Sequence, residues 1–225
     1  MVFPFGRATC YDAEHFMISS ANQQAVAWLQ RFPHWPAGGL IVQGDRGTGK
    51  THMLNVFVQQ RGAKKMTVSD ITSLLEEQHA LPPLAIDDVD QQLSAHHAEM
   101  LFHLLQRLHG EGGCIFLTST RPPAGWEISL NDLRSRLMAM GLATLAMPDD
   151  DLCRQMMAKA FADRQVDVGQ EVINHLLRHR GRNPATLLQW VERLDDAAMQ
   201  TKRKISLSLL LALEKEDEKG GETLF

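Results

Sequence analysis

Few cysteines occur in this sequence of 225 residues, and their positions exclude a disulfide framework. Cys10, Cys114 and Cys153 are odd in number and widely separated, whereas disulfide-stabilised domains carry paired cysteines at close spacing. None of the histidines lies in a zinc-binding spacing with a cysteine. We therefore expect reduced thiols and a cytoplasmic location.

Long apolar runs and an excess of basic charge are also lacking. No stretch is long enough to span a membrane, and the amino-terminal residues are too poor in apolar side chains for a signal peptide. The net charge is −4, so no global positive field would draw nucleic acid to the chain. Apolar residues make up 44% of the sequence, enough for a sizeable core. We expect a globular protein without a membrane partner.

What the sequence does contain is a complete phosphate-loop motif. Residues 44–51 match G-x-x-x-x-G-K-[ST], with an apolar run at 39–42 before them and a helical pattern from His52 onward. Glycines let the backbone wrap closely around phosphates, and the N-terminus of the following helix favours the anion. A chance glycine-rich turn is the alternative. The residues expected to bind ATP or ADP are Gly44, Asp45, Arg46, Gly47, Thr48, Gly49, Lys50, Thr51 and His52.

Within this motif, Lys50 would reach the β- and γ-phosphates, and the Thr51 hydroxyl would hold Mg²⁺. Paired carboxylates, Asp87 and Asp88, follow a second apolar run at 84–86. Asp87 would hold the Mg²⁺ shell through water, and Asp88 would polarise an attacking water. The alternative for this pair is an acidic turn after a strand.

The rest of the chain predicts an α/β fold followed by an all-helical part. Apolar runs at 65–68, 114–120 and 142–147 read as further strands, and helical patterns lie between them. Such alternation indicates a parallel sheet flanked by helices, with the ligand at the carboxyl ends of the strands. One of Thr118, Ser119 and Thr120 would then touch the γ-phosphate or the water. We expect domains at 1–147 and 148–216, and a flexible tail at 217–225.

Three segments carry a family resemblance. Asp87-Asp88, residues 117–123 and residues 133–137 resemble the AAA+ family of the replication initiator DnaA, and more closely its Hda group. The resemblance covers nearly the whole chain and implies a P-loop AAA+ module with a small helical lid. It makes the paired carboxylates the Walker B motif and places Thr120 at sensor 1. Arg136 falls at the position of the arginine finger.

Some residues depart from the family pattern. Sensor 1 is usually Asp, and here it is Thr120; sensor 2 is usually Arg, and here it is Ala185, with Arg182 as a substitute. The helices with which the initiator handles single-stranded DNA would lie between the Walker motifs, where only residues 66–83 are available. These departures weigh against fast ATP turnover by the chain itself.

The resemblance implies a regulator that stimulates hydrolysis of DnaA-bound ATP through Arg136, together with the sliding clamp (the β subunit) of DNA polymerase III. Hda-like proteins carry an amino-terminal clamp-binding peptide, and Phe3, Pro4 and Phe5 resemble its end, although its leading Gln is absent. Packing on the chain's own core is the alternative for these residues. Leu224 and Phe225 form a second, weaker candidate.

Two other functions stay open, a helicase loader of the DnaC type and a stand-alone ATPase. A loader would carry a basic surface for single-stranded DNA, which the sequence does not offer. No recognition helix follows the last helical pattern, so we expect no intrinsic sequence-specific DNA binding. Whether the chain assembles with copies of itself is left open.

Overall fold

The computed structural model of the chain describes residues 19–221, and side chains for residues 19–216. The chain divides into two compact units between Ala146 and Met147. Each unit is described by itself below. Within residues 19–221, no helix combines the length and apolar character needed to cross a membrane.

The first unit is built on a five-stranded parallel sheet with strand order β2-β3-β4-β1-β5. The strands are β1 (Gly39–Gln43), β2 (Lys64–Met66), β3 (Leu84–Ile86), β4 (Ile115–Ser119) and β5 (Gly141–Thr144). The helices are α1 (Gln23–Gln30), α2 (Lys50–Arg61), α3 (Ile71–Glu76), α4 (Ala95–Glu111) and α5 (Asn131–Met138). Short 3₁₀ turns are η2 (Pro36–Gly38), η3 (Val68–Asp70), η4 (Val89–Gln91) and η5 (Pro123–Gly125).

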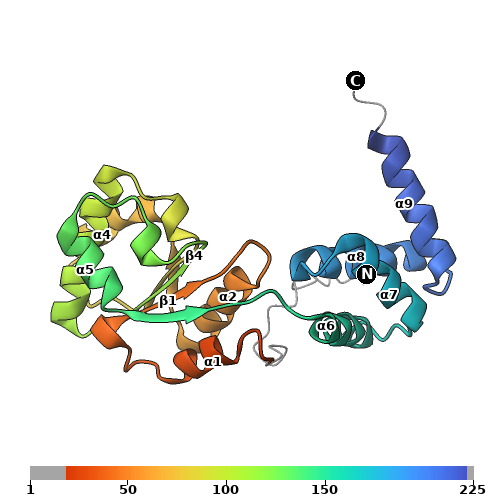
Figure 1. Cartoon of the computed structure of the whole chain (residues 1–225), viewed down its shortest axis with the longest axis horizontal. Helices are drawn as coiled ribbons and strands as arrows, with labels where there is room; N and C mark the ends of the chain where they lie inside the picture. Colours follow the sequence, from red (N-terminus) through yellow and green to blue (C-terminus); the bar gives the residue numbers. More distant parts are fainter. Residues whose placement is uncertain (1–18, 222–225) are drawn as a thin grey trace, which may run out of the picture. The chain divides into compact units, whose positions relative to one another are not determined.

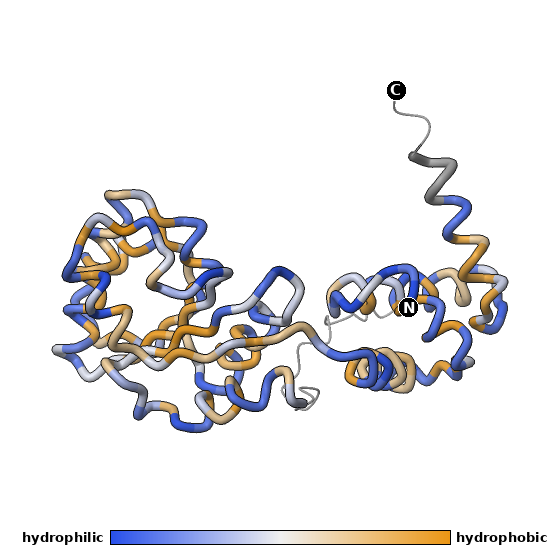
Figure 2. Tube along the Cα trace, in the orientation of Figure 1, coloured by the Kyte–Doolittle hydropathy of each residue, from blue (hydrophilic) through white to orange (hydrophobic). Residues whose placement is uncertain are grey.

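Alternating side chains of the strands build a core on each face of the sheet. Leu40 and Val42 of β1 pack in a cluster with residues of α1 and α2, including Phe57. Ile41, between them, packs on the other face with α3, α4 and α5. Because both faces are covered, the three inner strands β1, β3 and β4 are buried almost throughout, whereas the edge strands β2 and β5 carry exposed residues (Figures 1 and 2). The predicted parallel sheet flanked by helices is confirmed.

The second strand is shorter than the sequence predicts. We expected it to run through Val68, but β2 ends at Met66. Thr67 instead begins a turn, because its side chain and backbone N–H pair with Asp70 in a capping box. These two hydrogen bonds, the side-chain one first, also hold the pKa of Asp70 below its usual value.

The second unit is all-helical and has its own core. It consists of α6 (Asp150–Asp163), α7 (Gln170–Arg180), α8 (Pro184–Thr201) and α9 (Leu207–Gly221). Asp149 caps α6 by accepting from Leu152 N at 2.7 Å, and Asn183 caps α8 by accepting from Ala185 N at 3.0 Å. The four helices enclose an apolar cluster that includes Phe161 and Trp190. α9 runs on to Gly221 and so includes the first part of residues 217–225, for which we expected a flexible tail.

The parallel arrangement gathers the predicted site at one edge of the first unit. Gln43 pairs with Ser119, and Ile86 pairs with Leu117. The phosphate loop, the paired carboxylates and the hydroxyls after β4 therefore all leave the sheet at its carboxyl edge.

Candidate functional site

The phosphate loop has a backbone that only glycine accommodates easily. Gly47 and Gly49 have φ of 83° and 99°, in the left-handed region that side chains disfavour. At Gly44 a Cβ would lie 2.6 Å from Leu145 O and 2.8 Å from Thr48 Oγ1. α2 begins at Lys50, directly after the loop. The loop is thus closely curved around the amino terminus of a helix, as a phosphate site requires.

Lys50 lies inside this loop. Its side chain is 5% exposed, and Nζ donates to Gly44 O at 2.9 Å and to Asp45 O at 3.2 Å. The same Nζ is 3.5 Å from Asp88 Oδ1. The ammonium is therefore already positioned between the loop and the paired carboxylates.

The hydroxyl and the carboxylate predicted to hold a metal are in direct contact. Thr51 Oγ1 donates to Asp87 Oδ2 at 2.8 Å, although Thr51 lies in α2 and Asp87 directly follows β3. Thr118 Oγ1 donates to the other carboxylate oxygen, Asp87 Oδ1, at 2.5 Å. Oxygen ligands of this kind are those Mg²⁺ prefers, so Thr51 and Asp87 fit the role assigned to them.

Asp88 has an unusual backbone conformation. Its φ and ψ are 42° and 49°, in the left-handed region, which aspartate tolerates better than most residues. Its Oδ1 is buried and makes no hydrogen bond to any residue within 19–221. The ion pair with Lys50, at 3.5 Å, is too long to satisfy that oxygen. An unsatisfied carboxylate oxygen beside the phosphate loop suits a site that takes up a hydrated cation or a water.

The remaining loop residues occupy the rim of the site. Arg46 donates to Gln91 Oε1 of η4 at 3.2 Å, which brings η4 beside the loop. Thr48 Oγ1 donates to Asp45 O at 2.9 Å and stabilises the turn. His52 is half-buried in the first turn of α2. Every residue predicted to bind the nucleotide therefore lies in or beside one loop.

Thr120 is placed differently from the expectation for sensor 1. Its hydroxyl donates to Asp90 Oδ2 at 2.5 Å, and its N–H lies 3.1 Å from both oxygens of the same carboxylate. Thr118, two residues earlier and on the same face of the strand, contacts Asp87 instead. We had considered Thr118 among three hydroxyls, but Asp90 and Gln92 were missed. No spacing in the sequence identifies them, because the path of η4 decides what they contact.

Arg136 is remote from the phosphate loop of its own chain. It lies one turn before Met140, whose side chain packs against Gly39 at the start of β1, at the amino edge of the sheet. The phosphate loop begins beyond Gln43, at the opposite edge. A strand of this length separates the two by about 13 Å. Figure 1 shows α5 and the start of α2 at opposite ends of β1.

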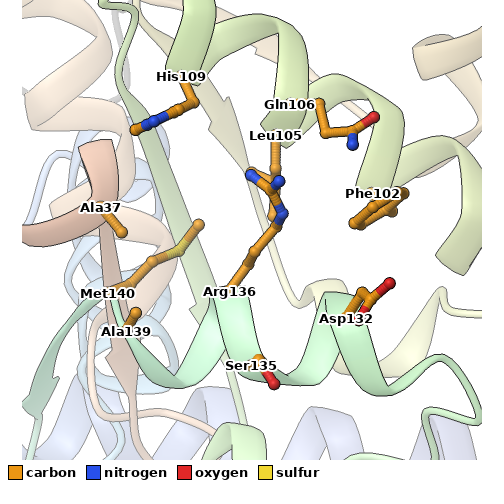
Figure 3. Close-up of a pocket in the computed structure, with 10 residues that line it drawn as sticks. All are labelled: Ala37, Phe102, Leu105, Gln106, His109, Asp132, Ser135, Arg136, Ala139 and Met140. Carbon is orange, nitrogen blue, oxygen red and sulfur yellow. The ribbon is translucent and has the colours of Figure 1, made fainter.

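A hollow of about 490 Å³ surrounds the Arg136 side chain. Arg136 points from α5 toward α4, and its guanidinium lies 5.2 Å from the ring centroid of Phe102 (Figure 3). His109 and Asp132 also line the hollow. No carboxylate within residues 19–216 forms an ion pair with Arg136. The guanidinium is thus partly sheltered on an aromatic ring but not neutralised.

The candidates for sensor 2 lie in the second unit. Arg182 Nε donates to Asp150 Oδ1 at 2.5 Å, so the proposed substitute is engaged within its own unit. Ala185 has no polar side chain to offer a phosphate. Nearby, Cys153 is buried, and burial, reinforced by the charge of Asp150, raises its pKa to about 11.

The predicted clamp-binding residues cannot be compared with the structure. Phe3, Pro4, Phe5, Leu224 and Phe225 lie outside residues 19–221. Inside that range, histidines, cysteines and carboxylates form no group of three or more suited to a metal ion.

The fold and the site define the class. A phosphate-loop motif and paired carboxylates at the carboxyl edge of a parallel sheet of order 2-3-4-1-5, followed by an all-helical unit, give the chain a AAA+ fold. The sequence pattern of the family described as "Hda, lid domain" matches residues 149–210.

Curated relatives point the same way. An uncharacterised protein of Haemophilus influenzae is 27% identical over 177 residues, which cover 74% of this chain and 77% of that protein. The chromosomal replication initiator protein DnaA of Caulobacter vibrioides is 32% identical over 164 residues, covering 62% of this chain and 33% of that protein. The chain therefore spans about a third of the length of that initiator.

Solved structures of low sequence identity share the fold. Domain III of the Thermotoga maritima replication initiation protein DnaA superposes with a TM-score of 0.78 at 23% identity, covering 93% of this chain and 97% of that one. The AMPPCP-bound DnaA of Aquifex aeolicus has a TM-score of 0.73 at 18% identity, covering 94% and 71%. The chain thus has the fold of these AAA+ structures and is similar in sequence to DnaA and, at residues 149–210, to the Hda lid family.

Proposed function

We propose that the chain is an Hda-like regulator of replication initiation that binds an adenine nucleotide and promotes hydrolysis of ATP bound to DnaA. Support comes from the Hda-type lid at residues 149–210 and from the sequence similarity to DnaA in the AAA+ module. The proposal assigns the two nucleotides different roles. The chain's own nucleotide would shape the module, and the nucleotide of DnaA would be hydrolysed.

The chain's own site would take ATP or ADP with Mg²⁺. The loop amides and Lys50 would hold the phosphates, while Thr51 and Asp87, already 2.8 Å apart, would hold the metal shell. The metal would neutralise charge on the phosphates. A neighbour of the same fold was solved with AMPPCP, which supports a nucleotide as the ligand class.

The position of Arg136 is the observation that carries the proposal. It lies at the amino edge of the sheet, away from its own phosphate loop, and no described carboxylate neutralises it. A guanidinium so placed is suited to a phosphate on a neighbouring molecule. Arginine fingers stabilise charge on the transferring phosphoryl group and contribute roughly 10³–10⁵ in rate in well-studied GTPases.

The sliding clamp and DnaA would be the partners, in the cytoplasm. Phe3 and Phe5 would anchor the amino-terminal segment in a clamp groove, since a few buried aromatic side chains can carry much of the binding energy of a peptide. The chain would not read DNA sequence by itself, and its contact with replicated DNA would go through the clamp.

A helicase loader and a stand-alone ATPase are the competing functions. The departures at Thr120 and Ala185 disfavour rapid hydrolysis by the chain alone, because one hydroxyl is engaged by Asp90 and the other position has no polar group. A DnaC-type loader would act on the helicase instead.

One set of hydrolysis measurements separates the three functions. ATP turnover is measured for the chain alone, with DnaA and the DNA-loaded clamp, and with the replicative helicase. The proposal predicts stimulation only when DnaA is present. Fast turnover by the chain alone, or a response to helicase but not to DnaA, would contradict it.

A further inference from the structure

The peptide that joins Asp87 to Asp88 is held at both ends by side chains. Its carbonyl, Asp87 O, accepts a hydrogen bond from Gln92 Nε2 at 2.6 Å. Its N–H, on Asp88, donates to Thr118 Oγ1 at 2.7 Å. Because a peptide unit is planar, fixing both polar groups fixes the orientation of the whole unit.

This fixed peptide accounts for the conformation of Asp88. A φ of 42° is uncommon for a residue with a Cβ and persists where surrounding contacts impose it. In this conformation Asp88 Oδ1 lies 3.5 Å from Lys50 Nζ, facing the phosphate loop. Loss of either hydrogen bond would let the peptide rotate and Asp88 relax away from that position.

The two side chains that fix the peptide are themselves held firmly. Thr118 is fully buried, and its hydroxyl also donates to Asp87 Oδ1 at 2.5 Å, so a single hydroxyl contacts both acidic residues. Gln92 Oε1 accepts from Val68 N at 3.1 Å, and Gln92 O lies 2.8 Å from His97 Nδ1. Gln92 thereby connects the acidic pair to the start of η3 and to the first turn of α4.

We propose that Thr118 and Gln92 are positioning residues that set Asp87 and Asp88 for a magnesium-bound nucleotide. The inference rests on the proposed nucleotide site and deepens it. Thr118 is the strand-end hydroxyl coupled to that site, since the Thr120 hydroxyl is engaged by Asp90. Removing either positioning group disturbs the metal side of the site and leaves the loop amides that hold the phosphates in place.

The variants are chosen to remove one contact each. Thr118→Val removes the hydroxyl at nearly constant shape, and Thr118→Ser restores it. Gln92→Glu keeps an oxygen that accepts from Val68 N but cannot donate to Asp87 O at neutral pH. Thr144→Val is the matched control, because it removes a hydroxyl from the end of β5 at the same sheet edge, where the hydroxyl accepts from Gln43 Nε2 at 2.9 Å.

The readout is the ratio of the ADP dissociation constants in EDTA and in Mg²⁺, measured by calorimetry. A purely structural role would lower the melting temperature but leave this ratio unchanged. We expect Thr118→Val and Gln92→Glu to lower the ratio roughly tenfold, the factor that corresponds to one lost hydrogen bond to a charged group. Thr118→Ser and Thr144→Val should keep the wild-type ratio.

The outcomes are separable. If Mg²⁺ raises the ADP affinity of the wild type and raises that of Gln92→Glu equally, the inference is wrong and the nucleotide site stands. Gln92→Glu gives this test even if the buried Thr118→Val variant fails to fold. An equal loss in Thr144→Val would also overturn the assignment of Thr118. If the wild type does not bind ADP, the proposed nucleotide site itself fails.

Discussion

Replacing Lys50 by alanine should separate the stability of the AAA+ module from its ability to bind nucleotide. In the folded chain the ammonium donates to Gly44 O and Asp45 O at 2.9 and 3.2 Å and faces Asp88 at 3.5 Å. Hydrogen bonds from a charged donor contribute about 1.5–3 kcal/mol each. Burying the charge costs several kcal/mol in lost hydration. These terms oppose each other, so we expect a net destabilisation of about 1–3 kcal/mol.

That loss is small enough to leave the variant folded. For a chain of this size, 1 kcal/mol corresponds to a shift in melting temperature of roughly 2–4 °C. The effect on nucleotide binding should be much larger. Two hydrogen bonds from the ammonium to the phosphates would be lost, which is about 3 kcal/mol or more and at least ~100-fold in dissociation constant.

Calorimetry with ADP and thermal unfolding of the same preparations test this prediction. Lys64→Ala is the control, because the Lys64–Glu77 pair at 2.9 Å is 45% and 44% exposed. Exposed pairs of this kind contribute no more than about 1 kcal/mol, so its ADP affinity should match wild type. Equal ADP affinity in Lys50→Ala and wild type would refute the assignment of the phosphate loop.

The other predictions concern a buried thiol, a buried ion pair and the amino-terminal segment. Burial raises the pKa of Cys153 from 9.0 to about 11, so the stability that this thiol contributes is present below pH 9 and is lost as the pH rises toward 11. Peptide mass spectrometry should find that Cys153 is alkylated slowly at pH 8 until the chain is unfolded. Rapid alkylation of Cys153 in the native chain would contradict this prediction. Arg164→Ala should lower the free energy of unfolding of the second unit by about 3–5 kcal/mol in denaturant, because it leaves Asp195, a carboxylate with 4% exposure, without the cation 3.8 Å away. Arg154 is more exposed, so the control variant Arg154→Ala should cost under about 1 kcal/mol. Equal effects of the two variants would show that Arg164 does not compensate Asp195. Deleting residues 1–5 should abolish clamp binding in a pull-down without changing ADP affinity, whereas normal clamp binding by the truncated chain would direct the search to Leu224 and Phe225.

Much of the fold follows from local patterns in the sequence. Apolar runs of strand length, separated by helical patterns, predicted the parallel sheet. The end of β2 was wrong because a side-chain hydrogen bond decided it: Asp70 reaches back to Thr67 and starts a turn. Such competition between side chain and backbone is weakly encoded in hydropathy.

For the site, the sequence predicted which residues lie at the same edge of the sheet, because strand order alone determines that. Thr51 and Asp87 follow β1 and β3 of a parallel sheet, so strand order brings these two predicted metal-site residues to one edge, where they are in contact. The left-handed conformation of Asp88 and the Asp90–Thr120 contact depend on the path of η4 after the strand. Residues about thirty positions apart meet there, and nothing in the local sequence specifies which of several oxygens accepts.

Arg136 illustrates the same division. The residues around it gave its family position, whereas its placement at the amino edge and its stacking on Phe102 required the three-dimensional structure. That placement turned a motif assignment into a mechanistic hypothesis, because it separates the guanidinium from its own phosphate loop.

The most direct test of this hypothesis is a single-turnover measurement on DnaA. DnaA is loaded with radiolabelled ATP, and hydrolysis is followed after adding the clamp on DNA with wild type, Arg136→Ala or Arg134→Ala. Arg134 serves as the control, since it lies on the same helix and donates to Ile128 O at 2.7 Å. We predict acceleration by wild type and by Arg134→Ala, and a loss of roughly 10³-fold or more in the rate gained with Arg136→Ala, which should still bind ADP. Undiminished acceleration by Arg136→Ala would contradict the account.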